Sequence, residues 1–200
     1  ETLELRTRDL PKTRDYASRI VGDVDTLSLL VDNILSFNRF QHGTWAPRPG
    51  PVPLQELLDH VEEELTGHAD RPVVWRVSGA ESLILRADRE LILLVLRNLA
   101  RNACVYCARD TVDIQVTASE HGGQHIVRMQ DNGVGIRDED QARIFEPFFR
   151  AAATQERRGS GLGLAICSEI ARAHGGSLRV AESSPGHGTI VELRLPGETS

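Results

Sequence analysis

The chain has 200 residues, of which 40% are hydrophobic and 26% charged, a composition that supports a globular core. Its formal net charge of −6 argues against broad, sequence-independent binding of nucleic acid, because such binding needs a surplus of Lys and Arg. The odd number of cysteines favours reduced thiols and a cytoplasmic location over a disulfide framework, and the CxxC at 104–107 predicts small side chains buried near a helix end. The longest apolar run, residues 91–96, is too short to cross a bilayer.

Residues 14–42 carry the apolar stripe of a long helix. Apolar side chains recur at steps of four, three, four and three residues, at Ile20, Val24, Leu27, Val31 and Ile34. This spacing is typical of a coiled coil or a helical bundle, and flanking apolar residues widen the stripe in favour of a bundle. We therefore predict that residues 1–43 hold mainly the second helix of a hairpin that a second chain, or residues outside this sequence, completes. A helix packed only on its own domain is the alternative.

Residues 43–53 (GTWAPRPGPVP) concentrate Gly and Pro, so we expect a linker at 44–53 and a second domain at 54–200. In the second domain, helical and strand periodicities alternate. Helices are expected at 54–65, at 89–104 and from about 162, and strands at 73–77, 83–85, 111–118, 125–130, 178–182 and 189–195. This pattern predicts an α+β fold, a two-layer α/β sandwich with helices on one face of a mixed sheet.

Two glycine-rich turns bracket residues 131–163. The first turn holds Gly133 and Gly135, and the second holds Gly159, Gly161 and Gly163. A glycine-rich turn that leads into a helix points backbone N–H groups and the positive end of the helix dipole at an anion. The second turn precedes a predicted helix, so we expect two backbone contacts to a nucleotide, joined by a mobile lid.

Asn98 and Asn102 are four residues apart in the predicted helix at 89–104, so their carboxamides share one helical face. Magnesium accepts carbonyl oxygens and typically takes one or two protein ligands, with phosphates and waters completing its shell. Beside two glycine turns, this pair predicts a magnesium site. The alternative is a pair of buried amides that hydrogen-bond within the protein.

Three further polar residues are candidates for nucleotide contacts. Asp131 follows a predicted strand and can accept a hydrogen bond from the exocyclic amine of adenine; an Asx turn is the alternative. Arg150 can reach a terminal phosphate as a bidentate fork, with a surface ion pair as the alternative. Thr189 ends a tight turn and can hydrogen-bond near the base. The apolar residues within 145–149 are expected to pack rather than to contact ligand.

Five short motifs then occur in order: NLARNA, DNGVGI, FEPFFR, GSGLGL and GHGT. They resemble the N, G1, F, G2 and G3 boxes of the sensor histidine kinases of two-component systems. The resemblance covers residues 52–196, and the helix ending LVDNILSFNRFQHG resembles the second helix of their dimerisation and phosphotransfer hairpin. It implies the ATP-binding fold shared with type II topoisomerases and mismatch-repair ATPases, with ATP and Mg²⁺ as cofactors.

The resemblance also implies roles for individual residues. Asn102 holds Mg²⁺, Asn98 supports the phosphate region and Asp131 reads the adenine amine. The remaining implied contacts come from Gly133 and Gly135, which shape the pocket, from Gly159, Gly161, Leu162 and Gly163, which cradle phosphates, and from Arg150 and Thr189. Residues 137–158 correspond to the ATP lid. The implied partners are a second copy, through the N-terminal helices, and the receiver domain of a response regulator, in the cytoplasmic part of a longer sensor.

Three departures from the family pattern bear on the reaction. Asn98 stands where the hydrolysing relatives have a glutamate that activates water, which favours phosphoryl transfer to a protein side chain. Val105 stands where the family usually has Lys or Arg, so a phosphate-facing cation is lost. No histidine has the context of the family's phosphoacceptor, and we expect that histidine outside this chain. A degenerate, non-catalytic nucleotide-binding module and an ATP-hydrolysing conformational machine are the alternatives.

Overall fold

The computed structural model describes residues 46–67, 71–151 and 160–197. The predicted helical segment at 1–43, the last part of the expected lid (152–158) and Gly159 lie outside these ranges. None of the helices in the described part of the chain combines the length and the apolar composition that crossing a membrane requires.

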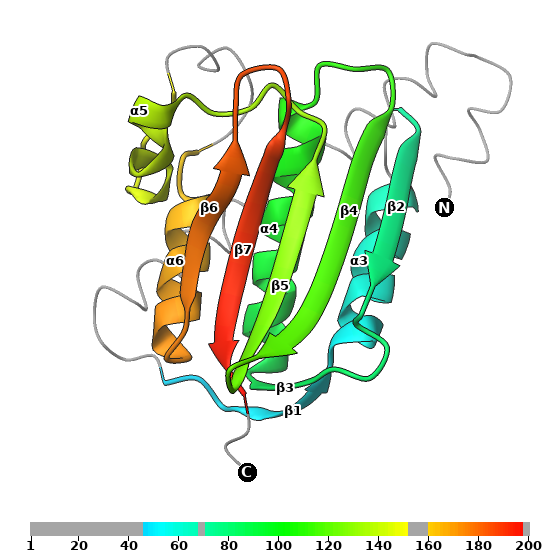
Figure 1. Cartoon of the computed structure of the whole chain (residues 1–200), viewed down its shortest axis with the longest axis vertical. Coiled ribbons are helices and arrows are strands. Elements are labelled where there is room, and N and C mark those ends of the chain that lie inside the picture. Colours follow the sequence, from blue (N-terminus) through cyan, green and yellow to red (C-terminus); the bar gives the residue numbers. More distant parts are fainter. Residues whose placement is uncertain (1–45, 68–70, 152–159, 198–200) are drawn as a thin grey trace, which may run out of the picture.

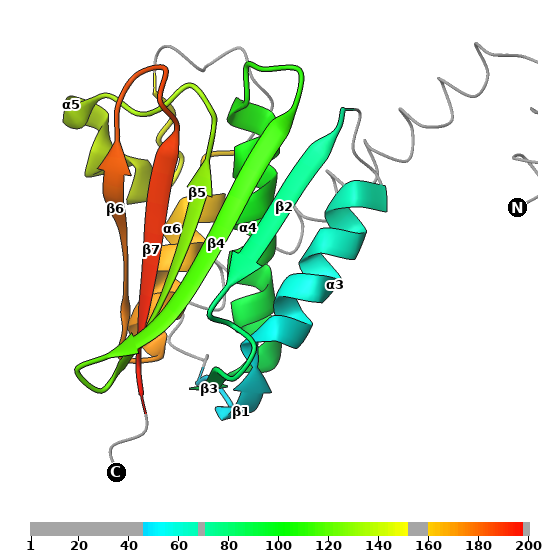
Figure 2. The same ribbon diagram turned by 45° about the vertical axis from the view of Figure 1, so that its right-hand side comes forward.

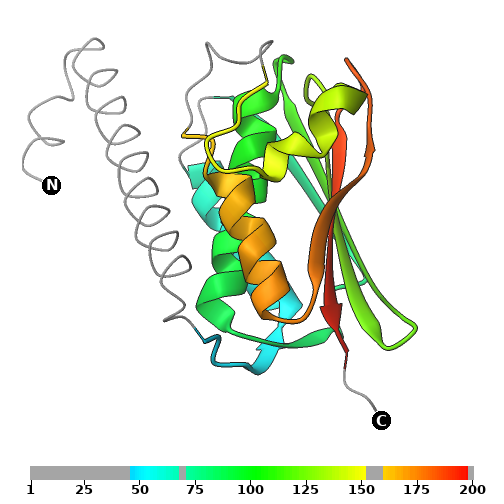
Figure 3. The same ribbon diagram turned by 90° about the vertical axis from the view of Figure 1, so that its left-hand side faces the viewer.

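Three helices lie side by side on one face of a five-stranded sheet (Figure 1). They are α3 (Leu54–Gly67), α4 (Arg89–Tyr106) and α6 (Gly163–Ala173). The central helix, α4, packs against both α3 and α6. Seen along the sheet edge, the helices form one layer and the strands the other (Figure 3). The predicted two-layer α/β sandwich is therefore confirmed.

The sheet is mixed, with strand order β2-β4-β5-β7-β6. Only the β2–β4 pair is parallel, and the other neighbours are antiparallel. The strands are β2 (Val73–Ser78), β4 (Val112–His121), β5 (Gln124–Asp131), β6 (Ser177–Ser183) and β7 (Thr189–Pro196). Between β5 and α6 lie the short helix α5 (Asp138–Gln141) and the 3₁₀ turn η1 (Arg143–Phe145).

A second, two-stranded sheet joins the start of the domain to the base of α4. Strand β1 (Gly50–Pro53) pairs antiparallel with β3 (Ile84–Ala87), and the Leu54 N–H donates to the Leu83 carbonyl at 3.0 Å. The segment expected as linker at 44–53 therefore ends in a strand that the sequence analysis did not predict. Pro51 and Pro53 lie in this two-stranded pair, where strand edges tolerate residues without an N–H donor.

The core lies between the sheet and the helices. Strand β4 alternates strictly, with Val112, Ile114 and Val116 fully buried on the helix-facing side. Helix α4 meets this side with apolar residues that are at most 1% exposed, among them Ile92, Val95 and Leu96. Burying each such side chain contributes about 1.5–3 kcal/mol, so α4 is held firmly along its length.

Four segments far apart in the sequence end at the same edge of the sandwich (Figures 1 and 2). They are the C-terminal half of α4, the N-terminus of α6, the end of β5 and the turn between β6 and β7. The core packing of α4 and the β5–β7 pairing fix their relative positions. These four segments carry nearly all the candidate residues within the described ranges.

Candidate functional site

Asn98 and Gly163 join the two helices at the site. Asn98 is only 4% exposed, and its Nδ2 donates to the Leu94 carbonyl at 2.9 Å, one turn earlier in α4. Its Oδ1 therefore faces Gly163, where a Cβ atom would lie 2.6 Å from that oxygen. Asn98 is thus a buried, hydrogen-bonded amide, as the alternative interpretation expected, and it also supports the start of α6.

Asn102 lies one turn after Asn98 in α4 and is half-buried. Helical spacing places its carboxamide above Asn98 on the same face, towards the end of α4 that meets the turn after β5. A partly exposed carboxamide oxygen on a rigid helix suits a divalent cation that keeps phosphate and water ligands. The donor set thus fits one protein ligand to Mg²⁺.

Asp131 is the last residue of β5, and its carboxylate is held by backbone N–H groups. The Gly133 N–H donates to its Oδ1 at 2.8 Å, which forms the Asx turn that the alternative interpretation predicted. Burial raises the pKa of Asp131, and the backbone hydrogen bonds from Gly133 and Thr189 lower it by less. A partly buried carboxyl with spare lone pairs can still accept from an exocyclic amine, so the Asx turn is compatible with the adenine contact, which stays a prediction.

Gly135 lets the turn after β5 lie against the turn between β6 and β7. Its φ is +72°, and a Cβ would overlap the Ser184 carbonyl oxygen. The Gly186 N–H donates to the Val134 carbonyl at 2.7 Å, which closes the contact. The missing Cβ thus admits another protein segment, and the predicted role of Gly135 in shaping a nucleotide pocket stays a prediction.

Gly161 packs in the same manner against Phe148, which lies within the expected lid at 137–158. Its φ is +72°, a Cβ would lie 2.7 Å from the backbone carbon of Phe148, and the Phe148 N–H donates to the Gly161 carbonyl at 3.0 Å. The expectation that the apolar residues within 145–149 pack was wrong for Phe148, which is 66% exposed with φ +65°. Phe145 packs against the core. The Arg143 guanidinium carbon lies 4.4 Å from the centre of the Phe149 ring.

Helix α6 begins without a side-chain cap, because the N-cap residue, Leu162, has no polar side-chain atom. Leu162 is only 3% exposed and belongs to the core, so its backbone rather than its side chain faces the site. The first N–H groups of a helix lack intrahelical acceptors, and the helix dipole adds positive potential there. The start of α6 therefore suits a phosphate.

Thr189 is buried at the start of β7 and hydrogen-bonds to Ser183, a residue that the sequence analysis did not single out. Their hydroxyl oxygens lie 2.9 Å apart, and the Ser183 Oγ accepts from the Ile136 N–H at 2.9 Å. Ser183 thereby joins the last strands to the turn after β5. The sequence carries no local signal for this contact, because it depends on the β6–β7 pairing that places Ser183 opposite Thr189.

Arg150 is half-buried and lies two residues before the segment 152–159, which the structure does not describe. Its contact with a terminal phosphate therefore stays a prediction. The same holds for Gly159. Among the candidates within the described ranges, the structure brings together Asn98 with Gly163, and Asp131 with Gly133 and Thr189.

Residues 87–199 match the family described as "Histidine kinase-, DNA gyrase B-, and HSP90-like ATPase". The chain belongs to this family. It is similar to the sensor-like histidine kinase SenX3 of Mycobacterium tuberculosis, with 31% identity over 98% of this chain and 48% of SenX3. It is also similar to the signal transduction histidine-protein kinase AtoS of Escherichia coli, with 35% identity over 98% of this chain and 31% of AtoS. The chain thus spans half or less of these curated relatives.

Solved structures of histidine kinases have the same fold as this chain. Full-length ShkA in complex with AMPPNP superposes with a TM-score of 0.73 at 28% identity, over 99% of this chain and 41% of ShkA. The mycobacterial sensor histidine kinase MprB gives a TM-score of 0.65 at 26% identity, over 76% of this chain and all of the MprB chain. The resemblance to sensor histidine kinases is confirmed, and residues 87–199 form the ATPase domain of this family.

Proposed function

We propose that this chain is the kinase portion of a sensor histidine kinase. It binds Mg-ATP and transfers the γ-phosphoryl group to a histidine outside this chain, from which a response-regulator aspartate receives it. The family match and the kinase relatives support this role. The AMPPNP complex of ShkA supports an adenine nucleotide as the ligand.

The observation that carries the choice of reaction is the state of Asn98. A carboxamide has no basic lone pair that could take a proton from water near neutral pH. Its Nδ2 is engaged by the Leu94 carbonyl and its Oδ1 lies against Gly163, so Asn98 supports the site without activating water. Phosphoryl transfer depends mainly on positioning and on electrostatic stabilisation, which a site without a general base can still supply.

The described residues offer a place for each part of the nucleotide. The Asp131 carboxylate would accept from the adenine amine, and the start of α6 at Gly163 would bind phosphate through backbone N–H groups. Asn102 would hold Mg²⁺, which when bound neutralises charge on the phosphates. Arg150 would reach the terminal phosphate from within the expected lid at 137–158.

The proposed partners follow from the same role. The acceptor histidine would lie on the first helix of a dimerisation hairpin, and residues 1–43, which the sequence predicts to be largely helical, would supply part of the interface with a second copy. The phosphorylated histidine would then be the substrate of a response-regulator receiver domain. The relatives named as sensor kinases support this assignment.

The test is incubation of the chain with labelled ATP, Mg²⁺ and a separate polypeptide that carries the first hairpin helix with its histidine. We expect acid-labile, alkali-stable label on that histidine, and its loss in Asn102→Ala. Tight ATP binding without labelled histidine would favour a non-catalytic nucleotide-binding module. Phosphate release by the chain alone, abolished by Asn102→Ala, would favour an ATP-hydrolysing machine.

A further inference from the structure

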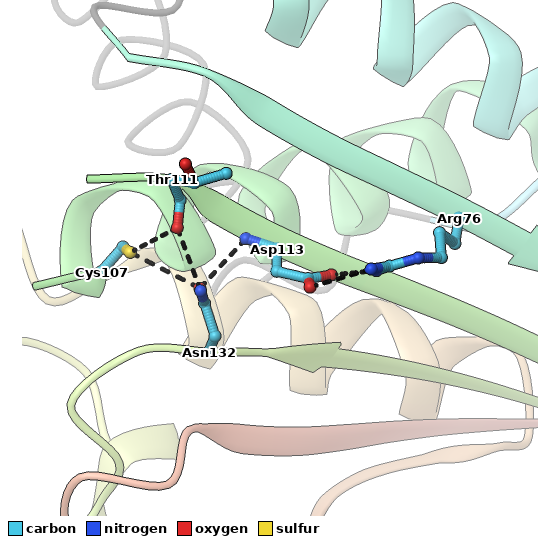
Figure 4. Close-up of polar contacts among 5 residues, drawn as sticks. All are labelled: Arg76, Cys107, Thr111, Asp113 and Asn132. Atoms are coloured by element: carbon cyan, nitrogen blue, oxygen red, sulfur yellow. Dashed lines mark hydrogen bonds and ion pairs between the residues drawn. The ribbon is translucent and has the colours of Figure 1, made fainter. Parts of the chain in front are cut away.

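Asn132 follows Asp131 and continues the β4–β5 ladder with its side chain (Figure 4). The backbone ladder ends at the pair Ile114–Asp131. Beyond it, the Asp113 N–H donates to the Asn132 Oδ1 at 3.0 Å, and the Asn132 Nδ2 donates to the Thr111 carbonyl at 3.0 Å. The carboxamide thus takes the place of a peptide group, which lets the backbone leave the sheet directly after Asp131.

The orientation of this amide is fixed by its partners. One partner is an N–H donor and the other is a carbonyl acceptor, so only one of the two amide orientations satisfies both. The Asp113 carboxylate does not compete for the amide, because it is paired with Arg76 on β2, at 3.1 Å for one of the two contacts (Figure 4).

The same side chain reaches the end of α4. Cys107, the C-cap residue of that helix, is 2% exposed, and its thiol lies within donor distance of three acceptors: the Asn132 Oδ1 at 3.5 Å and the carbonyls of Arg109 and Thr111 at 3.6 and 3.7 Å. The Val134 N–H, two residues after Asn132, donates to the Tyr106 carbonyl at the end of α4 at 3.1 Å. The turn after Asp131 is therefore tied both to β4 and to the helix that carries Asn102.

These contacts bear on the Asp131 carboxylate. The Gly133 N–H and the backbone of Thr189 both hydrogen-bond to it, and Gly133 lies one residue beyond Asn132 in the same turn. Gly133 is buried against the Tyr106 carbonyl, where a Cβ would lie 3.0 Å away. A shift of Asn132 would therefore move the Gly133 N–H relative to α4, and with it the Asp131 carboxylate to which this N–H donates.

We propose that Asn132 is a positioning residue for base recognition: its carboxamide holds the turn after β5 to β4 and to α4, and so sets the direction in which Asp131 meets the base. The inference rests on the proposed function, because it requires Asp131 to read adenine. Asn132 itself need not touch the nucleotide.

The test compares Asn132→Asp with the parent chain. The two side chains have nearly the same shape, but a carboxylate oxygen in place of Nδ2 would face the Thr111 carbonyl and repel it. We expect the preference for ATP over GTP to fall about tenfold, the equivalent of one good hydrogen bond. Binding of Mg-tripolyphosphate, which has no base, should stay within about twofold, because α6 and Asn102 are unchanged. If Asn132 had a purely structural role, the substitution would weaken the binding of ATP, GTP and tripolyphosphate together.

Variants at Cys107 give a milder, matched pair. Cys107→Ser keeps a donor towards the Asn132 Oδ1 and should keep the parent preference for ATP, whereas Cys107→Ala removes the donor and should lower that preference. Equal preferences in the two variants would count against the proposal. If Asn132→Asp does not fold by circular dichroism, Asn132→Ala replaces it, and failure of both to fold would overturn the assignment as a positioning residue.

The outcomes separate this inference from the proposed function. A parent chain that binds neither ATP nor tripolyphosphate overturns the proposed function and this inference with it. A parent chain that prefers ATP, beside a folded Asn132→Asp chain with the same preference, overturns this inference alone.

Discussion

Gly163 lies so close to Asn98 that a methyl group on Gly163 would come within 2.6 Å of the Asn98 Oδ1. The contact joins the start of α6 to the middle of α4. The hydrogen bond from Asn98 to the Leu94 carbonyl prevents the amide from turning away without losing a partner. The close approach of the two helices at this point therefore depends on the absence of a side chain at position 163.

Gly163→Ala should lower the free energy of unfolding by about 1–2 kcal/mol, because the added methyl group overpacks a buried contact. It should also weaken ATP binding, since it displaces the N-terminus of α6. Removing the obstruction in Asn98→Ala/Gly163→Ala should restore part of the lost stability, with a coupling free energy of about 1 kcal/mol in a double-mutant cycle by urea unfolding.

Gly67→Ala is the matched control for this cycle, because a Cβ at Gly67 would meet nothing within 4 Å. That substitution should leave stability nearly unchanged. Strict additivity of the two substitutions at 98 and 163 would show that the Asn98 side chain does not limit the approach of α6.

Much of the fold could be predicted from the sequence, because periodicity reports burial. The alternation at 111–118 and the apolar face at 89–104 appear in the structure as β4 and α4 with nearly the same limits. Asp88, which directly precedes this helix, caps it by accepting from the Leu91 N–H. These signals are local, so sequence alone carries them.

The rest depended on contacts between distant segments. Strand β1 is rich in Gly and Pro and forms only because β3 pairs with it. The exposure of Phe148 and the hydrogen bonds of Asn132 follow from where the turn at Gly161 and β4 lie, not from neighbouring residues. Spacing identified the glycines at the site, but it could not show that several of them make room for protein rather than for nucleotide.

Gly161→Ala is expected to destabilise the fold locally as well as to weaken nucleotide binding. Alanine is disfavoured at φ +72° by about 1 kcal/mol, and its Cβ would also press on the Phe148 backbone. We expect a total loss of about 2–3 kcal/mol in urea unfolding, together with a weaker thermal shift on addition of ATP.

Gly186→Ala separates the two contributions, because Gly186 has φ +81° but open space around its Cβ position. It should cost only the conformational part, about 1 kcal/mol. Equal losses at 161 and 186 would mean that the contact with Phe148 has no energetic weight.

Glu192 should make the fold sensitive to acid. Its side chain is fully buried on β7, and Arg194, Arg128 and Arg179 pair with it at 2.6–2.8 Å. Burial by itself would raise the Glu192 pKa, but the hydrogen bonds from the three arginines together lower it to about 2 from an ordinary 4.5. Its stabilising contribution is therefore complete above about pH 4.5 and is lost as the pH falls towards about 2.

Glu192→Gln should lose roughly 2–3 kcal/mol of stability at pH 7 and much less near pH 2, where the native carboxyl is itself becoming protonated. Thermal unfolding of both chains across this range measures the difference. Glu182→Gln, at an exposed position on β6, is the control and should change little. A loss at position 192 that stays constant with pH would point to shape rather than charge.

Asp131→Asn should separate stability from function. Because burial raises the pKa of Asp131, the native state holds its proton to a higher pH than the unfolded chain does. Above the ordinary pKa of 3.8, stability falls as the pH rises through the raised pKa, and the full cost of the buried charge remains at neutral pH. Asparagine keeps an oxygen for the Gly133 N–H and removes the charge, so stability near pH 7 should rise or stay level.

The same change should impair adenine recognition, because the asparagine amide adds donors beside an amine that needs an acceptor. The preference for ATP over GTP, measured by competition, should fall at least about tenfold while Mg-tripolyphosphate still binds. Asp110→Asn, at an exposed position after α4, should leave both stability and nucleotide preference as in the parent. An Asp131→Asn chain that keeps the ATP preference would assign base recognition to other residues, and one that is less stable at pH 7 would show that the carboxylate is needed for the fold.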